Sequence, residues 1–291
     1  MNLVILGKNS FLGNALEKYF LTKKFNVSKI SSASFSIDNL ESLEKVVISS
    51  QPKYVINCIA MTKVDDAEKD PKLALLLNTK LVENIAKICQ KHNIKGINFS
   101  TDYVFDGRKH EPYTESDVTN PLSIYGKTKL EGELKFSYYH PKGLQLRTAW
   151  LYGEGKANFI TNFYDAICKN KKISTVIDQV GSPTWINDLA YYTDGLKDQS
   201  GLFHVVNKNT ASRVDCYLEI LAFCERKFGF KRYAAEILEK KLLKDFPFTA
   251  TRPSYSCLDC TKASDLIPSG IRSWKNALKE FLFEYSKRNS P

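Results

Sequence analysis

The chain has 291 residues, of which 43% are hydrophobic and 25% are charged, the composition of an ordinary globular protein. This length suffices for one large α/β domain or for a domain with a smaller companion. Only eight of the 42 basic residues are Arg, and these are dispersed along the chain, so the net charge of +10 comes mainly from Lys. We therefore expect a lysine-rich surface that does not bind nucleic acid but whose positive potential suits a polyphosphate ligand.

Three further features limit the class of protein. Residues 1–7 carry no charged leader and too short an apolar run for a signal peptide or membrane span, so we expect a cytoplasmic protein that does not contact a membrane. Seven scattered cysteines predict reduced core residues rather than disulfides. Cys257 and Cys260 form a lone C-x-x-C, and the four histidines lie far apart, so no metal site is predicted.

Short β-branched runs alternate with helical patterns over the first 150 residues. We predict strands at 3–6, 26–30, 54–59, 95–100 and 144–149, and helices near 11–22, 39–50, 70–92 and 123–139. Apolar residues at helical spacing between Leu73 and Ile88 predict that the third helix faces the core. This alternation is typical of right-handed βαβ crossovers and predicts an α/β fold with a doubly wound parallel, Rossmann-type sheet.

The alternation loosens after Trp150. Helices are predicted near 157–170, 187–197, 212–228 and 273–287, with extended runs at 173–177 and 202–206. We predict a Rossmann domain over 1–150 and, over 151–291, mainly a smaller C-terminal substrate-binding lobe, some of whose segments can return to the first sheet. Ligands should lie beyond the carboxyl ends of the parallel strands.

The first predicted strand runs into a glycine turn. Gly7, Ser10 and Gly13 fit a G-x-x-G-x-x-G spacing in which Ser10 replaces the middle glycine. A dinucleotide pyrophosphate can bind at the N-terminus of the helix that follows. The Cβ of Ser10 crowds this position, although its hydroxyl could hydrogen-bond phosphate, and a ligand-free β–α turn is the alternative.

The end of the second predicted strand bears on the choice of cofactor. An acid here would bind the adenosine ribose of NAD, but residues 28–32 (SKISS) contain hydroxyls and a cation and no carboxylate. We therefore expect NADPH, with NADH as the alternative.

Tyr125 and Lys129 lie four residues apart in a predicted helix, so their side chains project from the same face. A nearby ammonium favours the phenolate and should lower the Tyr125 pKa, making the phenol a usable proton donor. Thr101 lies 24 residues earlier, at the end of a predicted strand. These residues suggest a hydride-transfer enzyme, although the pair alone also fits a surface Lys beside a half-buried aromatic ring.

Several motifs in register resemble those of the dTDP-4-dehydrorhamnose reductases, extended members of the short-chain dehydrogenase/reductase superfamily. The matching segments are 64–68 (VDDAE), 100–107 (STDYVFDG), 121–129 (PLSIYGKTK), 147–153 (RTAWLYG), 178–184 (DQVGSPT) and 252–253 (RP). They occur in family order and span most of the chain, which makes them more specific together than any one alone.

The resemblance implies NAD(P)H-dependent reduction of the C4 ketone of a nucleotide-linked deoxysugar, with dTDP-4-dehydro-L-rhamnose as the leading substrate. Thr101 would hydrogen-bond the carbonyl, Tyr125 would donate the proton, and Lys129 would hold the nicotinamide ribose and lower the phenol pKa. With the two turn glycines, the expected cofactor contacts are Gly7, Ser10, Phe11, Leu12, Gly13, Ala60, Met61, Thr62, Tyr125 and Lys129. The expected substrate contacts are Val64, Thr101, Asp102, Tyr103, Trp150 and Arg252, the last suited to a diphosphate.

Alternatives stay open. The chain could be an epimerase or 4,6-dehydratase of the superfamily, although a dehydratase typically has an Asp-Glu pair after the Thr, where this chain has Asp102 and Tyr103. It could also be a non-catalytic NADP-binding subunit like the regulatory β subunit of methionine adenosyltransferase. Trp150 and Tyr103 could be plain core aromatics, and Thr101 and Asp102 could simply cap a loop.

The chain departs from the family pattern at one position near the expected adenine site, and a metal-dependent dimer of some relatives bears on its assembly. Ser36 stands where many relatives have an acidic residue near the adenine, so binding of the adenosine half is expected to differ. Some relatives bind magnesium at a dimer contact. A homodimer is compatible with the sequence, but no acidic cluster is assigned to such a metal.

Overall fold

The computed structural model describes residues 1–229 and 237–290. Its centre is a six-stranded parallel sheet in the order β10-β5-β4-β3-β1-β2. The strands are β1 (Asn2–Leu6), β2 (Asn26–Ile30), β3 (Tyr54–Asn57), β4 (Lys95–Thr101), β5 (Leu144–Thr148) and β10 (Gly201–His204). The strand order reverses between β1 and β3, the place where ligands of doubly wound sheets bind.

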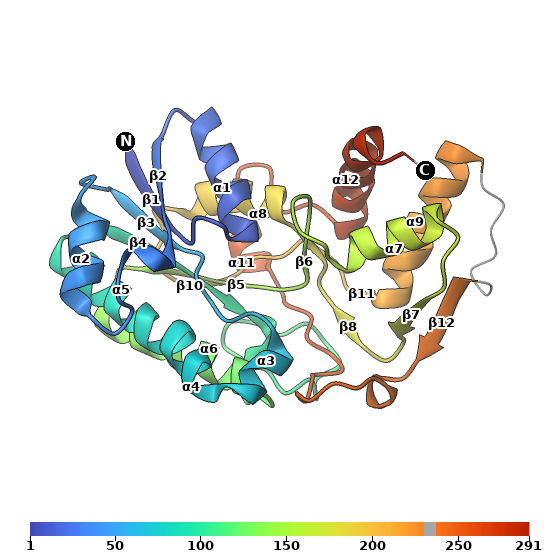
Figure 1. Ribbon diagram of the computed structural model, residues 1–291, viewed down its shortest axis with the longest axis horizontal. Coiled ribbons are helices and arrows are strands. Elements are labelled where there is room, and N and C mark those ends of the chain that lie inside the picture. The colour runs from blue at the N-terminus through green and yellow to red at the C-terminus, as the bar shows by residue number, and fades with distance from the viewer. Residues whose placement is uncertain (230–236, 291) are drawn as a thin grey trace.

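The central strands β1 and β3 are buried on both faces, which explains why they are mainly apolar runs rather than alternating ones. In β1, Leu3 and Ile5 pack into one core cluster with residues of α1 (Phe11–Thr22) and α8 (Ile186–Leu196). Val4 and Leu6 point the other way, into a second cluster. This second cluster lies under α2 (Leu40–Ile48) and α5 (Leu81–Lys91), so helices cover the sheet on both sides (Figure 1).

The predicted helix over 70–92 is confirmed, but the predicted inward position of Leu73 is wrong. The helical segment runs through α4 (Pro71–Leu75), a π-helical turn (Leu76–Lys80) and α5, and it is preceded by an unpredicted short helix, α3 (Val64–Lys69). Leu73 is 40% exposed, and the buried positions of the turn are Asn78 and Thr79. Asn78 and Thr79 hydrogen-bond to α6 (Ile124–Tyr139), and these polar contacts, not the leucine spacing, determine which side faces inward.

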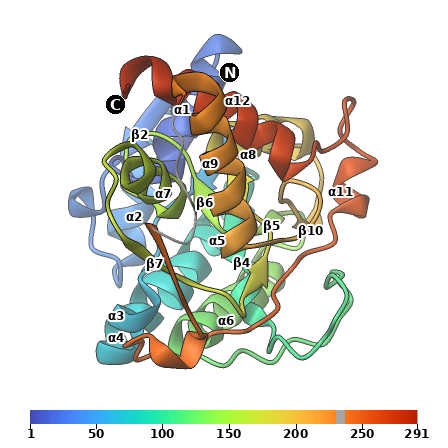
Figure 2. The ribbon, with the colours of Figure 1, turned by 90° about the vertical axis from the view of Figure 1, so that its right-hand side faces the viewer.

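The C-terminal half forms most of a second lobe, which Figure 2 shows from its outer side with α7 (Phe159–Cys168) and α9 (Arg213–Phe228) towards the viewer. Its strands are short pairs: β6 (Leu151–Tyr152) with β9 (Thr184–Trp185), β8 (Val180–Gly181) with β11 (Ala211–Ser212), and β7 (Ile173–Val176) with β12 (Leu238–Lys241). The remaining helices are α11 (Thr261–Ser264) and α12 (Trp274–Arg288).

Two segments after residue 150 belong to the central sheet layer. Strand β10 pairs in parallel with β5, and α8 packs against α1. The chain therefore passes from the first lobe to the second and back, which brings residues from both lobes to one cleft. The predicted α/β fold with a parallel Rossmann-type sheet is confirmed. No helix of the described residues is long and apolar enough to cross a membrane.

Candidate active site

A cavity of about 720 Å³ opens beyond the carboxyl ends of β1, β3, β4 and β5. Its walls include twelve of the predicted site residues: Ser10, Phe11, Leu12, Ala60, Thr62, Val64, Thr101, Asp102, Tyr103, Tyr125, Lys129 and Trp150. Gly7, Gly13, Met61 and Arg252 are not part of its lining. One continuous space thus joins the glycine turn to the predicted catalytic residues.

The glycine turn has the geometry that a phosphate-binding turn requires. Gly7 has a φ of +106°, and a Cβ there would come within 3.2 Å of the Cys58 backbone. Gly13 has no room for a Cβ either, because it would overlap the Ser10 hydroxyl and meet the Gly7 carbonyl oxygen at 3.1 Å. The two glycines therefore shape the turn from behind rather than line the cavity.

Ser10 is the N-cap of α1, and its hydroxyl oxygen accepts a hydrogen bond of 2.9 Å from the Gly13 N–H. Its φ of −73° is ordinary for a residue with a Cβ, so serine fits this position without strain. The hydroxyl turns towards the helix, and the crowding of a bound phosphate by the Ser10 Cβ stays a prediction. The N–H groups of Phe11 and Leu12, which follow directly, have no acceptor within the helix and are available to an anion.

The loop over 60–62 is held by a residue that the sequence analysis missed. The Asn78 side chain accepts a hydrogen bond from the Met61 N–H at 2.9 Å and donates to the Met61 carbonyl at 3.3 Å. It also donates to the Thr128 hydroxyl at 3.1 Å, which links the loop to the helix that carries Tyr125. A polar residue at an inward position of an otherwise apolar helix was the available signal.

Thr101 ends β4 and, with Asp102, starts a short 3-10 turn (Asp102–Val104). The Thr101 hydroxyl donates to the Asp102 carboxylate at 3.0 Å and accepts from the Tyr103 N–H at 3.2 Å. The other Asp102 oxygen accepts a 2.5 Å hydrogen bond from Ser256, a second residue that sequence reasoning missed. Burial raises the Asp102 pKa to about 6, and these hydroxyl donors limit the rise.

Tyr125 lies in the first turn of α6, and its ring meets the Tyr103 ring edge-on at 5.8 Å. Helix α6 can approach so closely because a Cβ on Gly126 would overlap the Tyr103 carbonyl oxygen. The expected lowering of the Tyr125 pKa is wrong for these surroundings. Burial raises the pKa well above its usual value, and hydrogen bonding with Thr101 offsets this only in part. The phenol is therefore neutral and able to donate a proton.

Lys129 is buried one helical turn beyond Tyr125. Its ammonium donates a 2.6 Å hydrogen bond to the Phe99 carbonyl of β4, and burial lowers its pKa to about 8, against the opposing charge of Glu133. Glu133 itself forms a buried ion pair of 2.7 Å with Arg147. The Lys129 ammonium is thus fixed by the backbone of the strand that ends in Thr101.

The substrate-side wall is closed by Trp150, whose backbone has an unusual φ of +45°. Its indole packs so tightly on Gly181 that a Cβ there would overlap the ring. Its indole N–H is buried without a hydrogen-bond partner among the residues described. Gly181 belongs to the 178–184 motif, so the two motif segments meet here.

Arg252, which does not line the cavity, is bound to a carboxylate of the first lobe. It forms a bidentate pair with Asp65 of α3, at 3.2 and 2.6 Å. The same carboxylate accepts the N–H groups of Thr249 and Ala250, both at 2.9 Å. The Asp65 pKa is lowered, mainly by the hydrogen bonds from Arg252 and further by those from the two N–H groups. This latch, Asp65 with residues 249–252, ties the C-terminal segment to the first lobe.

The adenosine end differs from the sequence expectation in detail. Lys29, the cation at the end of β2, is held by α1 through a 2.6 Å ion pair with Glu17 and a 2.9 Å hydrogen bond to Asn14. Ser36 hydrogen-bonds to the exposed carboxylate of Asp38 at 2.6 Å. An acidic group is therefore present beside Ser36, two residues later in the chain.

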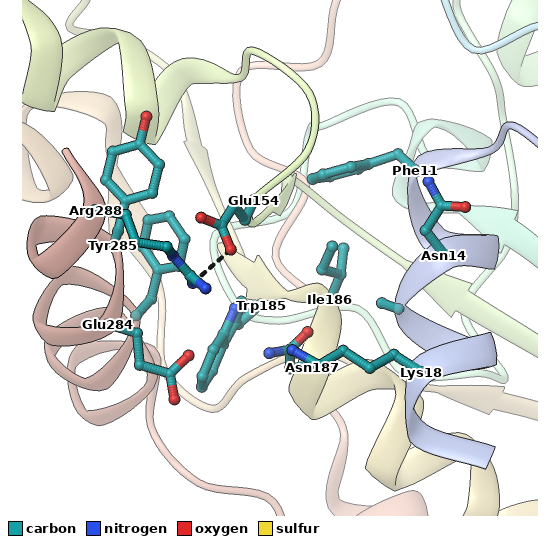
Figure 3. Close-up of a pocket in the computed structure, with 12 residues that line it drawn as sticks. Phe11, Asn14, Lys18, Glu154, Trp185, Ile186, Asn187, Glu284, Tyr285 and Arg288 are labelled. Carbon is teal, nitrogen blue, oxygen red and sulfur yellow. Dashed lines mark hydrogen bonds and ion pairs between the residues drawn. The ribbon is translucent and has the colours of Figure 1, made fainter. Parts of the chain in front are cut away.

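A second, smaller cavity of about 130 Å³ lies between α1, α8 and α12. Figure 3 shows Phe11 and Asn14 on one side of it and Arg288, paired with Glu154 at 2.6 Å, on the other. None of the proposed catalytic residues lines it. Within residues 1–229 and 237–290, no three His, Cys, Asp or Glu side chains are grouped so that they could hold a metal ion.

The larger cavity combines the parts that ketone reduction requires. A glycine turn at a helix N-terminus suits a dinucleotide. The neutral Tyr125 phenol can donate a proton to a carbonyl oxygen, and the Thr101 hydroxyl can contact the same oxygen. Two buried hydroxyls in its lining, those of Ser100 and Thr148, have no partner among the described residues. They offer further hydrogen bonds to a bound ligand.

Comparisons with known proteins identify the family of the chain. The chain is 31% identical to the dTDP-4-dehydrorhamnose reductase of Aggregatibacter actinomycetemcomitans, over 95% of this chain and 97% of that protein. A dTDP-4-dehydrorhamnose reductase from Clostridium acetobutylicum has a solved structure with a TM-score of 0.87 and 35% identity, covering 98% of this chain and all of the other.

A reductase of the same name from Bacillus anthracis, solved in complex with NADP, has a TM-score of 0.89 and 30% identity over 97% of this chain and 99% of that one. Residues 1–287 match the family described as the RmlD substrate binding domain. The resemblance drawn from the motifs is confirmed, and the chain belongs to the RmlD substrate-binding-domain family.

Proposed function

We propose that the protein reduces the C4 ketone of a nucleotide-linked deoxysugar with NADPH or NADH, and that dTDP-4-dehydro-L-rhamnose, converted to dTDP-L-rhamnose, is its substrate. The observation that carries the proposal is the placement of Thr101, Tyr125 and Lys129 around one cavity that also contains the N-terminus of α1. The names of the relatives support the choice of sugar nucleotide.

The residues fit a dinucleotide cofactor. The N-terminus of α1 offers the N–H groups of Phe11 and Leu12 to a pyrophosphate, behind a turn in which Gly7 cannot carry a Cβ. Ala60, Met61 and Thr62 would contact the cofactor from the next loop, which Asn78 holds in place. A reduced nicotinamide supplies the hydride when it is bound.

The chain's own residues supply the proton and the alignment. Thr101 turns its hydroxyl proton from Asp102 to the C4 oxygen, and Tyr125 donates its phenolic proton to that oxygen as C4 accepts hydride, so the ketone becomes the alcohol. The ammonium of Lys129, fixed on the Phe99 carbonyl, binds the nicotinamide ribose and stabilises the phenolate that remains. Val64, Asp102, Tyr103 and Trp150 hold the sugar, and Arg252 closes over the diphosphate side.

NADPH is the proposed cofactor. Residues 28–32 place no carboxylate where an NAD-specific enzyme would bind the ribose, and the Bacillus anthracis relative was solved with NADP. Lys29 would have to exchange its contact with Glu17 for a 2′-phosphate.

A substrate screen tests the proposal. Purified protein would be mixed with NADPH or NADH and with a panel of nucleotide 4-keto sugars, and the loss of nicotinamide absorbance followed. We expect oxidation of NADPH only in wells that contain a keto-sugar nucleotide, fastest with dTDP-4-dehydro-L-rhamnose. Cofactor binding without turnover of any sugar, together with a co-purifying partner, would instead indicate a binding subunit.

A further inference from the structure

Arg213 is the first residue of α9, and the charge of Asp102 acts on its guanidinium without forming an ion pair. Its Nη1 is buried and has no hydrogen-bond partner, and no described residue forms an ion pair with it. The guanidinium carbon lies 3.6 Å from the centre of the Trp150 ring and 4.0 Å from that of Phe159. Stacking on two aromatic rings fixes the plane of the group but uses none of its five N–H donors.

The other arginines with low exposure differ in this respect. Arg147, Arg252 and Arg272 each hold a carboxylate, at 2.7, 2.6 and 2.7 Å respectively. Arg213 is partly buried, and burial lowers its pKa to about 10. Removing an unpaired guanidinium from water is unfavourable, so a group in this state is suited to an incoming anion.

The position of Arg213 indicates which part of a ligand it can meet. Arg213 does not itself line the cavity, but its guanidinium stacks on Trp150, which does. The glycine turn belongs to the first lobe, whereas α9 belongs to the second. Burial raises the pKa of Tyr103, as does Asp102, while the charges of Arg213 and Arg252 both act to lower it. Both guanidiniums therefore act electrostatically on Tyr103, which lines the cavity.

In a nucleotide sugar, the diphosphate is attached at C1, across the ring from C4. If C4 lies at Thr101 and Tyr125, the diphosphate must lie one sugar ring away, and the cofactor already takes the α1 side. We propose that Arg213 is a recognition residue for the diphosphate of the substrate and that it binds phosphate oxygens while stacked on Trp150. This inference rests on the proposed function, because it assumes that the C4 ketone is the reacting group.

The test measures binding of dTDP, and of thymidine as the ligand without phosphates, by isothermal titration calorimetry. Three forms are compared with the wild type. Arg213→Gln removes the charge. Arg213→Met removes the charge as well but keeps an apolar contact with Trp150. Arg226→Gln, the matched control, removes an exposed charge from the same helix.

We expect Arg213→Gln and Arg213→Met to weaken dTDP binding at least about tenfold, with thymidine and NADPH binding unchanged and Arg226→Gln equal to the wild type. Equal dTDP affinity in Arg213→Met and the wild type would overturn the inference and leave Arg213 a packing partner of Trp150. A wild type that binds NADPH but no dTDP would overturn this inference together with the proposed sugar nucleotide. Turnover of a keto-sugar nucleotide with undiminished affinity in Arg213→Gln would overturn the role of Arg213 alone.

Discussion

The two sides of the cleft are built in different ways. The proposed cofactor side consists of one strand, one turn and one helix that are contiguous in the chain, and the groups that would bind the cofactor there are mostly backbone N–H groups. The substrate side is built from side chains distant in sequence, such as Asp102 with Ser256 and Asp65 with Arg252. The cofactor side should therefore tolerate side-chain changes that the substrate side does not.

The largest stability effect is expected at Asp102, and it depends on pH. The Asp102 pKa is raised from 3.8 to about 6 by burial, so the folded state binds the proton more tightly than the unfolded state. The free energy of unfolding should therefore fall by up to about 3 kcal/mol as pH rises from 4 to above 6, because Asp102 then loses its proton in the folded state. Asp102→Asn removes the charge. The free energy of unfolding of this variant, relative to that of the wild type, should therefore increase over that pH range. Urea unfolding at pH 4.5 and 8 measures this.

If the difference in the free energy of unfolding between Asp102→Asn and the wild type did not change with pH, burial would not destabilise the charged carboxylate. Ser256→Ala serves as the companion variant, because it removes a hydroxyl donor to the carboxylate. It should increase the pH dependence, since the remaining carboxylate is then harder to ionise.

Gly126→Ala tests the contact between the two sides. The added methyl would overlap the Tyr103 carbonyl oxygen and force α6, with Tyr125, away from the Thr101 turn. We expect a loss of about 2–3 kcal/mol in the free energy of unfolding and a lower kcat. Gly195→Ala is the matched control, because its methyl meets only Ile267 side-chain atoms, the nearest at 3.3 Å. Equal stability of the two variants would refute the close approach.

The latch should contribute less to the free energy of unfolding than the Gly126 contact, because the Asp65 carboxylate is partly exposed. Asp65→Asn weakens the pairing with Arg252 and the contacts with residues 249 and 250, and should cost about 1–2 kcal/mol and raise the KM for the sugar nucleotide. Asp66→Asn is the control, since Asp66 only pairs with exposed Lys63 at 3.4 Å. A KM for Asp65→Asn that matches that of Asp66→Asn would argue against a role of the latch in substrate binding.

Ser10→Ala should have the smallest effect. It removes the N-cap of α1 and should reduce stability by about 1 kcal/mol, seen as a small fall in Tm. NADPH affinity should change little, because the backbone N–H groups remain. A large loss of NADPH affinity with unchanged Tm would show that the hydroxyl binds phosphate rather than the helix.

The fold could be predicted from the sequence, whereas the contacts that hold the candidate site together could not. Strands, a glycine turn and an i, i+4 pair depend on neighbours in the chain, so spacing alone pointed to Gly7 and Lys129, whose roles stay predictions. Asn78, Ser256 and Arg213 act across 17 to 154 residues, and only Asn78 is marked by a local pattern, a polar residue at an inward helix position. The Tyr125 pKa was predicted in the wrong direction because desolvation depends on the whole fold.

The proton-donating role of Tyr125 is the central claim, and the initial rate of NADPH oxidation with dTDP-4-dehydro-L-rhamnose tests it most directly. The wild type is compared with Tyr125→Phe and with Tyr138→Phe, which changes a 77% exposed tyrosine of the same helix. We predict that Tyr125→Phe lowers kcat by about 10²–10⁴-fold with unchanged NADPH affinity, while Tyr138→Phe equals the wild type. Turnover of Tyr125→Phe within about twofold of the wild type would contradict the mechanism.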